Sequence, residues 1–442
     1  MKKTLLKTLS ASMLLLVATI VTARETRGKL DETRTARVTM DAPMDANIYV
    51  KGNDTQITLE TWKEASIDVT AVVTFKGDEN EDIIKFLDDF QNIVQDKINK
   101  SGNSFRISTV LDQPNKAEWG TKIFNLVTIS YSKKELEITY LIKVPEDVEL
   151  EVETSYEDLV LNGNYKNRLS VKQNSADLIA GSLEKAEILM KYGDISIQKL
   201  GDARLDFYEV QGEINSATSL DMQTKYSDLE MEDIGSIKIE SYETKLDIEQ
   251  IEDLRGELKY GEIEIEQNAG MLILEAIYEI DIEGKAAQSI EIKDSKYSSV
   301  KFSEVANLRM LESYEDEIDI TRLGAFNSTA KYLDLKIDVL FGDLNLSDSY
   351  EVDVKINEYK RPIRKARIDG KYMKVKIPQI GPGGLSVEVQ GKYVNLNYDL
   401  NEFKQTVYIK DGSDLHAKLV SKDAQEFTLV QVTGYDIKVN LN

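Results

Sequence analysis

Carboxylates and a single histidine are the side chains of this 442-residue chain that could act in catalysis. The chain contains 78 Asp and Glu residues, and glycoside hydrolysis requires only two carboxyl groups at a suitable separation. Clusters such as Glu315, Asp316, Glu317 and Asp319 therefore arise by chance in so acidic a sequence. With His416 as the only histidine, a two-histidine metal site and a Ser-His-Asp arrangement with a spare base are excluded. We expect no catalytic residues and no enzymatic activity.

Motifs for nucleotides and metals are also missing from the sequence. Gly381-Pro-Gly-Gly384 lacks the Lys-Ser/Thr pair of a phosphate-binding loop and is expected to form a turn. The chain has no cysteine, which excludes disulfides, thiolate metal sites and lipid attachment through cysteine. Neither an EF-hand loop nor a Gly-Gly-x-Gly-x-Asp repeat occurs. We expect no cofactor-binding residues, no metal-binding residues and no cofactor, with Ca²⁺ on surface carboxylates as an open alternative.

Regularly spaced tyrosines offer a different chemistry, which is aromatic stacking on a sugar or on a partner chain. One set, at gaps of 34 to 37 residues, comprises Tyr156, Tyr192, Tyr226, Tyr260, Tyr297 and Tyr332. A second set lies halfway between them, and each of its members is followed by Glu: Tyr208, Tyr242, Tyr278, Tyr314 and Tyr350. A short phrase such as Tyr192-Gly-Asp-Ile-Ser-Ile197 thus returns about every 18 residues.

A fixed period of this kind is typical of a stacked array, in which each unit buries its apolar face against its neighbours. Each unit consists of two short alternating stretches separated by the tyrosine, and no helical pattern interrupts the array. Residues 151–360 are therefore predicted to form a parallel β-solenoid of roughly 18-residue rungs, stacked about 4.8 Å apart. Right-handed winding, that of a right-handed β-helix, is the usual hand of a parallel crossover.

The alternation of side chains along each unit breaks once, at the tyrosine. Tyr226 is in phase with Leu220 and Met222, but out of phase with Leu229 and Met231. The second set reverses this relation, so each ring shares a face with one apolar flank. This pattern favours tyrosines that lean inward as packed corner residues over an exposed ladder. The Glu residues beside the second set are predicted to form a hydrated column, with a cation- or sugar-binding stripe as the alternative.

The ends of the chain differ from the array. Residues 1–23 have the pattern of a signal peptide, with Lys2, Lys3 and Lys7 before an apolar run and Val21-Thr-Ala23 as a cleavage site. No later segment has 18 consecutive apolar residues, so we expect no transmembrane segment in the mature chain. We expect export to the periplasm, the outer-membrane surface or the medium, and not as a lipoprotein.

Residues 24–150 are predicted to form a small α+β domain that caps the array. A helix over about 80–99 follows from Ile83, Leu87, Phe90 and Val94 at helical spacing, with Gly102 as a stop. Alternating patterns predict six strands, at 48–50, 57–59, 67–75, 105–107, 126–129 and 136–142. The helix is expected to cover one sheet face.

Residues 361–442 are predicted to form a β-rich C-terminal cap or a continuation of the solenoid. The segment opens with basic residues, among them Arg361, Arg364 and Arg367, which are expected on a solvated face. The whole chain carries −23, and removal of the three leader lysines leaves −26. With 13 Lys/Arg against 9 Asp/Glu after residue 360, residues 24–360 carry −30. Such a field repels phosphate backbones, so we expect no nucleic-acid partner.

The order of these motifs resembles the bacterial putative-adhesin family, exported proteins of unknown function with Tyr-Gly-Asp β-coil repeats. The likeness rests on Thr61-Trp-Lys63, the strand at 67–75, the helix, and Val144-Pro-Glu-Asp-Val-Glu-Leu150 leading into Tyr156-Glu-Asp-Leu-Val-Leu161. It covers nearly the whole mature chain. The Tyr-Glu of alternate units departs from the family pattern. The resemblance implies a β-solenoid at the cell envelope with an adhesive role, and it carries over no functional residues.

The sequence therefore favours a non-catalytic, exported binding or scaffold protein of the envelope or cell surface. An envelope glycan or a protein is the expected partner. Two alternatives stay open. One is a polysaccharide-binding or polysaccharide-cleaving β-helix, which requires outward tyrosines and, for cleavage, a carboxylate pair in a groove. The other is a structural spacer. The sequence sets neither the oligomeric state nor the ligand.

Overall fold

The computed structural model describes residues 29–78, 81–110, 121–123, 127–129, 136–360, 365–378, 384–422, 424 and 427–441. Within these residues the chain is mainly β, with one helix and long parallel-paired strands, as the sequence predicts at that level. The signal-peptide pattern, Arg361, Arg364 and most of the Gly381–Gly384 turn lie outside them. No helix in the described part is both long and apolar enough to cross a membrane.

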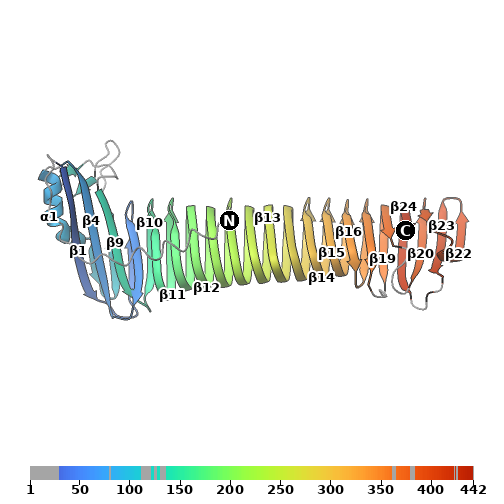
Figure 1. The fold of residues 1–442 in the computed structure, drawn as a ribbon, viewed down its shortest axis with the longest axis horizontal. Coiled ribbons are helices and arrows are strands. Elements are labelled where there is room, and N and C mark those ends of the chain that lie inside the picture. The colour runs from blue at the N-terminus through green and yellow to red at the C-terminus, as the bar shows by residue number, and fades with distance from the viewer. Residues whose placement is uncertain are drawn as a thin grey trace.

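The middle of the chain winds into an elongated coil of parallel rungs (Figure 1). Gln211 pairs with Asp228, 17 residues later, and Ile282 pairs with Val300, 18 residues later. The longest strands therefore run through several turns without a break. The elements of this part are β10 (Glu149–Ser155), β11 (Leu159–Asn174), β12 (Leu178–Lys225), β13 (Asp228–Lys296), β14 (Ser299–Tyr314), β15 (Glu317–Lys331), β16 (Asp334–Leu340), β17 (Leu344–Tyr350) and β18 (Asp353–Tyr359).

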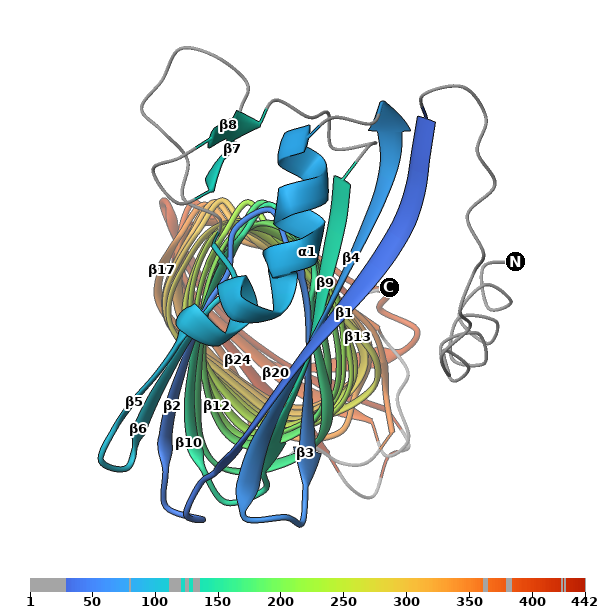
Figure 2. The same ribbon diagram turned by 90° about the vertical axis from the view of Figure 1, so that its left-hand side faces the viewer.

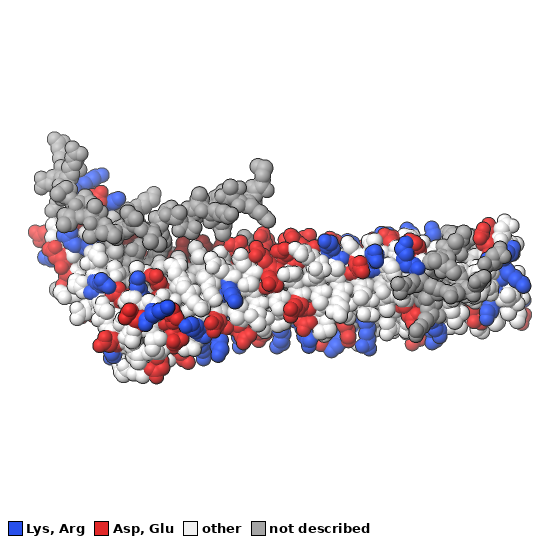
Figure 3. Space-filling model, turned by 60° about the horizontal axis from the view of Figure 1, so that its bottom comes forward, with Lys and Arg blue, Asp and Glu red and all other residues white. Residues whose placement is uncertain are grey.

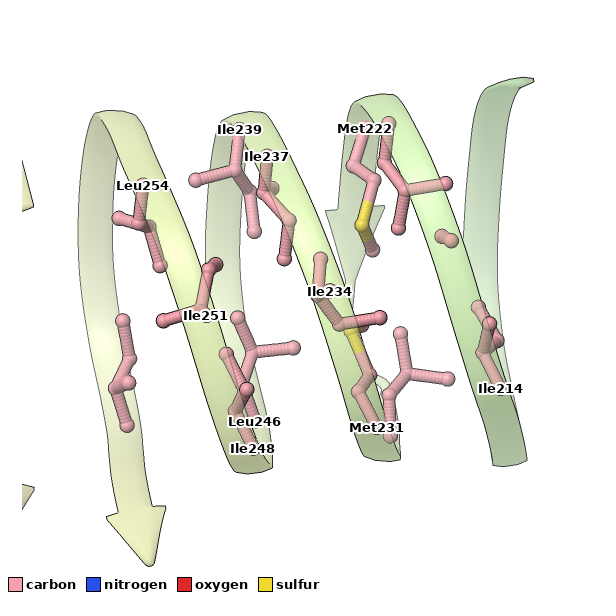
Figure 4. Packing of buried hydrophobic residues seen from close by; sticks show 14 of the residues in the cluster. Ile214, Met222, Met231, Ile234, Ile237, Ile239, Leu246, Ile248, Ile251 and Leu254 are labelled. Carbon is pink, nitrogen blue, oxygen red and sulfur yellow. The ribbon is translucent and has the colours of Figure 1, made fainter. Parts of the chain in front are cut away.

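The core is a column of apolar side chains that point into the coil and stack from rung to rung. Ile214 and Met231 are register partners on adjacent rungs, and both are at most 2% exposed. Figure 4 shows these side chains together with Ile248 and Leu254, all directed toward the interior. Full burial of such a side chain contributes roughly 1.5–3 kcal/mol to stability. Because the adjacent rungs bury these side chains, each rung depends on its neighbours for stability.

The N-terminal strands belong to the same sheet as the coil. The strands before β10 are β1 (Lys29–Asp41), β2 (Asn47–Lys51), β3 (Gln56–Trp62), β4 (Ser66–Asp78), β5 (Ile98–Ser101), β6 (Ser104–Ser108), β7 (Thr121–Ile123), β8 (Val127–Ile129) and β9 (Leu136–Pro145). Because β2 pairs in parallel with β10 and β3 with β11, these two strands extend the stack of rungs. Only β7 and β8 form a separate two-stranded sheet among the described strands.

The helix closes the N-terminal end of the coil (Figure 2). It is α1 (Glu81–Asp96), and its buried Ile83, Leu87 and Phe90 join the core. The sequence places the helix end about three residues too late, because Ile98–Ser101 leaves the helix and pairs with β6 as β5. All six predicted strands are present, although Leu126 of the 126–129 strand lies outside the described residues. Strands β1, β5 and β7 were not predicted. In β1 only Ala36 of 13 residues is buried, so the strand has little apolar alternation.

At the C-terminal end the order of rungs departs from the order of the chain. The elements are β19 (Ala366–Ile377), β20 (Leu385–Lys392), β21 (Asn395–Asn397), β22 (Phe403–Asp411), β23 (Asp414–Ser421) and β24 (Thr428–Leu441). The last strand, β24, lies between β19 and β20 and pairs in parallel with both. Gly434 permits this insertion, since its φ is +144° and a Cβ there would lie 1.7 Å from the Gly370 carbonyl oxygen. The antiparallel β22–β23 hairpin then closes the stack.

Candidate functional site

A continuous ladder of tyrosine rings runs along the outside of the coil. Thirteen rings of the described chain are joined by edge-to-face contacts, with centroids 5.2–5.8 Å apart and planes inclined by 68–81°. In spatial order they are Tyr192, Tyr208, Tyr226, Tyr242, Tyr260, Tyr278, Tyr297, Tyr314, Tyr332, Tyr350, Tyr372, Tyr435 and Tyr393.

The prediction of inward-leaning tyrosines is wrong. Tyr226 is 42% exposed and Tyr297 is 45% exposed, so these rings lie at the surface. The reason is the backbone at the corner. A residue in the left-handed region reverses the local direction of the side chains, and simple alternation in the sequence does not reveal that reversal.

Two kinds of corner carry the rings. At Lys-Tyr corners, such as Lys225-Tyr226, the tyrosine itself is left-handed, and these tyrosines have φ of 55–59° in the ladder. At Tyr-Glu corners, such as Tyr242-Glu243, the glutamate is left-handed instead, with φ of 47–54°. The left-handed residue is therefore shifted by one position between the two kinds of corner. This shift explains why the alternation in the sequence breaks on opposite sides of the tyrosine in the two sets.

The alternation of corners explains the edge-to-face geometry. The Lys225 and Tyr242 Cα atoms are register partners, and Tyr226 N donates to Tyr242 O at 3.0 Å. Successive rings therefore arise from neighbouring backbone columns, which turns each ring relative to the next. Edge-to-face pairs are preferred over a face-to-face sandwich, and each contributes about 0.5–1.5 kcal/mol beyond buried area. These contacts offset a left-handed non-glycine residue, which costs roughly 1–2 kcal/mol.

Tyr435 is the ladder member that sequence reasoning missed. Tyr372 and Tyr393 are both preceded by lysine, so two Lys-Tyr corners follow each other along the chain. In space Tyr435 lies between them, and the following Asp436 takes the left-handed role with φ of 51°. The β24 strand thus supplies the missing Tyr-acid corner. In the sequence, the missing Tyr-acid corner between Tyr372 and Tyr393 was the feature that could have indicated insertion of a distant segment.

Two charged columns flank the ladder. Lysines occupy one side at every second rung: Lys191, Lys225, Lys259, Lys296, Lys331, Lys371 and Lys392. Glutamates occupy the other side at the rungs between: Glu209, Glu243, Glu279, Glu315 and Glu351. Both columns are exposed, as either a hydrated Glu column or a cation- or sugar-binding stripe requires. The lysine column was not foreseen, although the residue before each first-set tyrosine from Tyr192 onward reveals it.

The glutamates interact with the adjoining tyrosine hydroxyls. Interaction of the Tyr278 hydroxyl with the Glu279 carboxylate is the main reason that the pKa of Tyr278 is raised, and burial is the second. At Tyr314 the bond to Glu315 raises the pKa in the same way. Burial is the leading cause at Tyr242, with the Glu243 charge second. The corner thus places a hydrogen-bond acceptor, an aromatic ring and, one rung away, a cation on a single exposed strip.

Asp316 and His416, the other candidate residues of the sequence, do not belong to the ladder surface and do not lie together. Asp316 is buried beneath a corner, where Ser298 N donates to Oδ1 at 3.0 Å and Tyr314 N donates to Oδ2 at 3.2 Å. Burial raises its pKa, and these hydrogen bonds oppose the shift. His416 lies on strand β23, with Nε2 3.0 Å from Glu388 Oε1.

Acidic and basic side chains are interspersed along the coil (Figure 3). Lys293 Nζ lies 2.7 Å from Glu275 Oε2, and Lys301 Nζ lies 3.4 Å from Glu283 Oε1, each pair joining residues 18 apart on adjacent rungs. Among the described residues, no group of three or more Asp, Glu or His side chains converges as a metal site. The basic residues of the C-terminal part include Arg367 and Lys371, both exposed on β19.

Comparison with known proteins adds little. No family model and no curated protein matches the chain. A solved structure of a putative cell adhesion protein from Clostridium sporogenes aligns over 93% of this chain and 99% of its own length, at 8% identity and a TM-score of 0.16. Agreement at this level establishes neither a shared fold nor a shared function.

Proposed function

We propose that the chain is a non-catalytic, exported binding or scaffold protein of the bacterial envelope, adhesin-like, in which a right-handed β-solenoid presents the tyrosine ladder as its binding face. The observation that carries this proposal is the ladder itself. Exposed aromatic rings flanked by unlike charges combine the apolar area and polar partners that recognition surfaces use. A long exposed row of aromatic rings on a chain of net charge −23 is the kind of surface that marks an interaction site.

The test is retention by envelope material. Immobilised mature chain is incubated with a glycan panel and with envelope extract, with and without Ca²⁺. We expect retention that falls when Tyr226, Tyr260 and Tyr297 are replaced together by Asn, which tolerates the left-handed backbone. Retention that needs Ca²⁺ would assign a role to that ion. Equal retention of ligands by wild type and the triple variant would remove the ladder from the binding face.

A structural spacer is the second candidate, and the ring contacts favour it. Each ring already packs its face or edge on two neighbours, so the ladder stiffens the rod without any ligand. This alternative predicts that deletion of one double rung, residues 226–259, shortens the rod and leaves function intact. A binding face would lose affinity for long ligands in the same variant.

A further inference from the structure

We propose that the ladder binds a linear β-1,4-linked glycan that carries a carboxylate on every second sugar, laid along the axis of the coil. The inference rests on the proposed function, because it names the ligand class of the same face. Three features of the alternating corners support it: the two-rung period, the alternation of ring orientation, and the lysine column.

The surface repeats every second rung. Rungs of a parallel sheet lie about 4.8 Å apart, so equivalent corners recur at about 9.6 Å. An extended β-1,4-linked polysaccharide has the same kind of repeat, because successive sugars are turned by half a revolution and each spans about one rung. The disaccharide repeat is slightly longer than the two-rung repeat of the protein, so the ligand and the strip stay in register over a few disaccharides.

The rings that would contact alternate sugars share an orientation. Adjacent ring planes are inclined by 68–81°, whereas rings two steps apart stand on corners of the same kind, with the same left-handed residue. Most Lys-Tyr rings are also more exposed than the rings between them. Tyr226, Tyr297 and Tyr372 exceed 40% exposure, whereas Tyr242 and Tyr278 are half-buried, and Tyr260 is the half-buried member of the Lys-Tyr class. The strip therefore offers a prominent ring at most of its two-rung repeats.

The charged columns select the substituents of such a ligand. Within the described residues, Lys191, Lys225, Lys259 and Lys331 have no ion pair, although acidic residues outnumber basic ones in this part of the chain. Lys296 is the column member that does, since its Nζ lies 3.2 Å from Asp294 Oδ2. Cations at every second rung match a carboxylate on every second sugar. The Glu column on the other side accepts hydrogen bonds, which suits the hydroxyl and amide donors of the intervening sugars.

The length of the strip predicts how affinity depends on ligand length. Seven lysines and thirteen rings in one line offer several equivalent subsites in the described chain. Each added disaccharide occupies another subsite of the same ligand, which makes its binding intramolecular and strengthens the whole. A single disaccharide should bind weakly, and a long strand should bind much more tightly.

The experiment titrates mature chain with two probes by calorimetry. The acidic probe is peptidoglycan glycan strand freed of peptides, in which N-acetylmuramic acid supplies a carboxylate on every second sugar. The neutral probe is chitohexaose, which has the same linkage and no carboxylate. Acidic strands of two, four and six sugars are compared with the neutral hexasaccharide at low and high salt.

Two matched triple variants separate binding from stability. The Lys-Tyr variant replaces three exposed rings, Tyr226, Tyr297 and Tyr332, by Asn. The control replaces the less exposed rings of the intervening corners by the same residue: Tyr242→Asn, Tyr278→Asn and Tyr314→Asn. Each triple removes six ring contacts. The Lys-Tyr variant should lose the less thermal stability, because Asn tolerates the left-handed backbone of those corners. Weaker binding by that variant is then not explained by unfolding. A third variant replaces Lys225, Lys259 and Lys331 by Gln.

We expect affinity for the acidic strand to rise with each disaccharide and to exceed that for the neutral probe by at least tenfold. The Lys-Tyr variant should lose at least tenfold in affinity, and the control triple less than threefold. The lysine variant should abolish the preference for the acidic strand and the salt dependence. Equal binding of both probes, an equal effect of both tyrosine triples, or affinity independent of length would overturn the inference.

Two further outcomes are decisive. Retention of envelope protein together with failure of both glycan probes would leave the proposed function standing and refute the glycan. Concentration-dependent dimerisation that the Lys-Tyr variant abolishes, seen by sedimentation velocity, would assign the ladder to a second copy of this chain and equally refute the glycan.

Discussion

Gln91 on α1 exchanges two hydrogen bonds with the backbone of Arg37 on β1. The Arg37 N–H donates to Gln91 Oε1 at 3.0 Å, and Gln91 Nε2 donates to the Arg37 carbonyl at 3.1 Å. Among the described strands, β1 pairs only with β4 and would otherwise present an open edge at this point. One side chain thus occupies the donor and the acceptor to which another strand would bind.

Replacement of Gln91 by Ala should therefore weaken the N-terminal cap. We expect a loss of about 1–2 kcal/mol, the usual worth of one or two net hydrogen bonds, and faster aggregation through the uncovered edge. Chemical unfolding and light scattering measure these two effects. Gln91→Glu keeps the acceptor and removes the donor, so it should fall between wild type and Ala. Wild-type behaviour of Gln91→Ala would show that the edge is protected by other groups.

Loss of the hydroxyl should change the free energy of unfolding in opposite directions at Tyr359 and Tyr49. Tyr359 is 1% exposed, and within the described residues its hydroxyl has no hydrogen-bond partner. Tyr359→Phe should thus stabilise the chain by about 1 kcal/mol, since an unsatisfied buried group costs roughly 1–3 kcal/mol. The Tyr49 hydroxyl donates to Glu153 Oε2 at 2.7 Å, so Tyr49→Phe should destabilise by a similar amount. Destabilisation by both would point to a water partner at Tyr359.

Asp68 should contribute stability that is lost in acid. Burial would raise its pKa, but hydrogen bonds from Arg37 and Thr39, both at 2.8 Å, and the guanidinium charge hold the pKa below the ordinary value. The contribution is complete above the ordinary Asp pKa of about 3.9. It disappears as the pH falls through the lower folded value. Asp68→Asn should cost about 1–2 kcal/mol near neutral pH and little at acid pH. A difference that stays constant with pH would contradict the linkage.

Asp316 should show the opposite dependence. Burial raises the pKa of this carboxyl, so the folded state must ionise a buried group as the pH rises from the ordinary Asp value through the raised one. Stability decreases over that window. Ser298 and Ser227 follow the left-handed residue of their own corners as Asp316 does, which makes Asp316→Ser a natural replacement. The variant should gain on wild type as the pH rises, in unfolding measured at a series of pH values. Parallel profiles would refute the assignment.

Removal of β24 should open the C-terminal end without unfolding the coil. A chain ending at Phe427 leaves β19 and β20 without their shared neighbour and loses the buried Val430 and Val432. We expect rapid proteolysis after about residue 365 and protection of the earlier rungs, because rungs are stabilised mainly by their neighbours. A synthetic peptide of residues 428–441 added in trans should restore protection. The same peptide with Asp at positions 430 and 432 is the control, and rescue by it would argue against strand insertion.

Much of the architecture follows from local pattern. The helix could be placed because Ile83, Leu87 and Phe90 recur at a period that only a helix buries on one face. The long array could be recognised since each unit repeats the same alternation and the same corner. The predicted helix end was late because pairing of Ile98–Ser101 with β6 overrides local preference, which a single segment does not encode.

For the candidate site, the sequence by itself determined the residues and their period: tyrosines about every 18 positions, glutamates after alternate ones and lysines before the others. Only the tertiary structure decided that the rings face outward, because a left-handed residue at each corner redirects them. Only it placed Tyr435 between Tyr372 and Tyr393. That placement depends on backbone pairing between Gly370 and Gly434, 64 residues apart, and contacts at such separation are set by the whole stack of rungs.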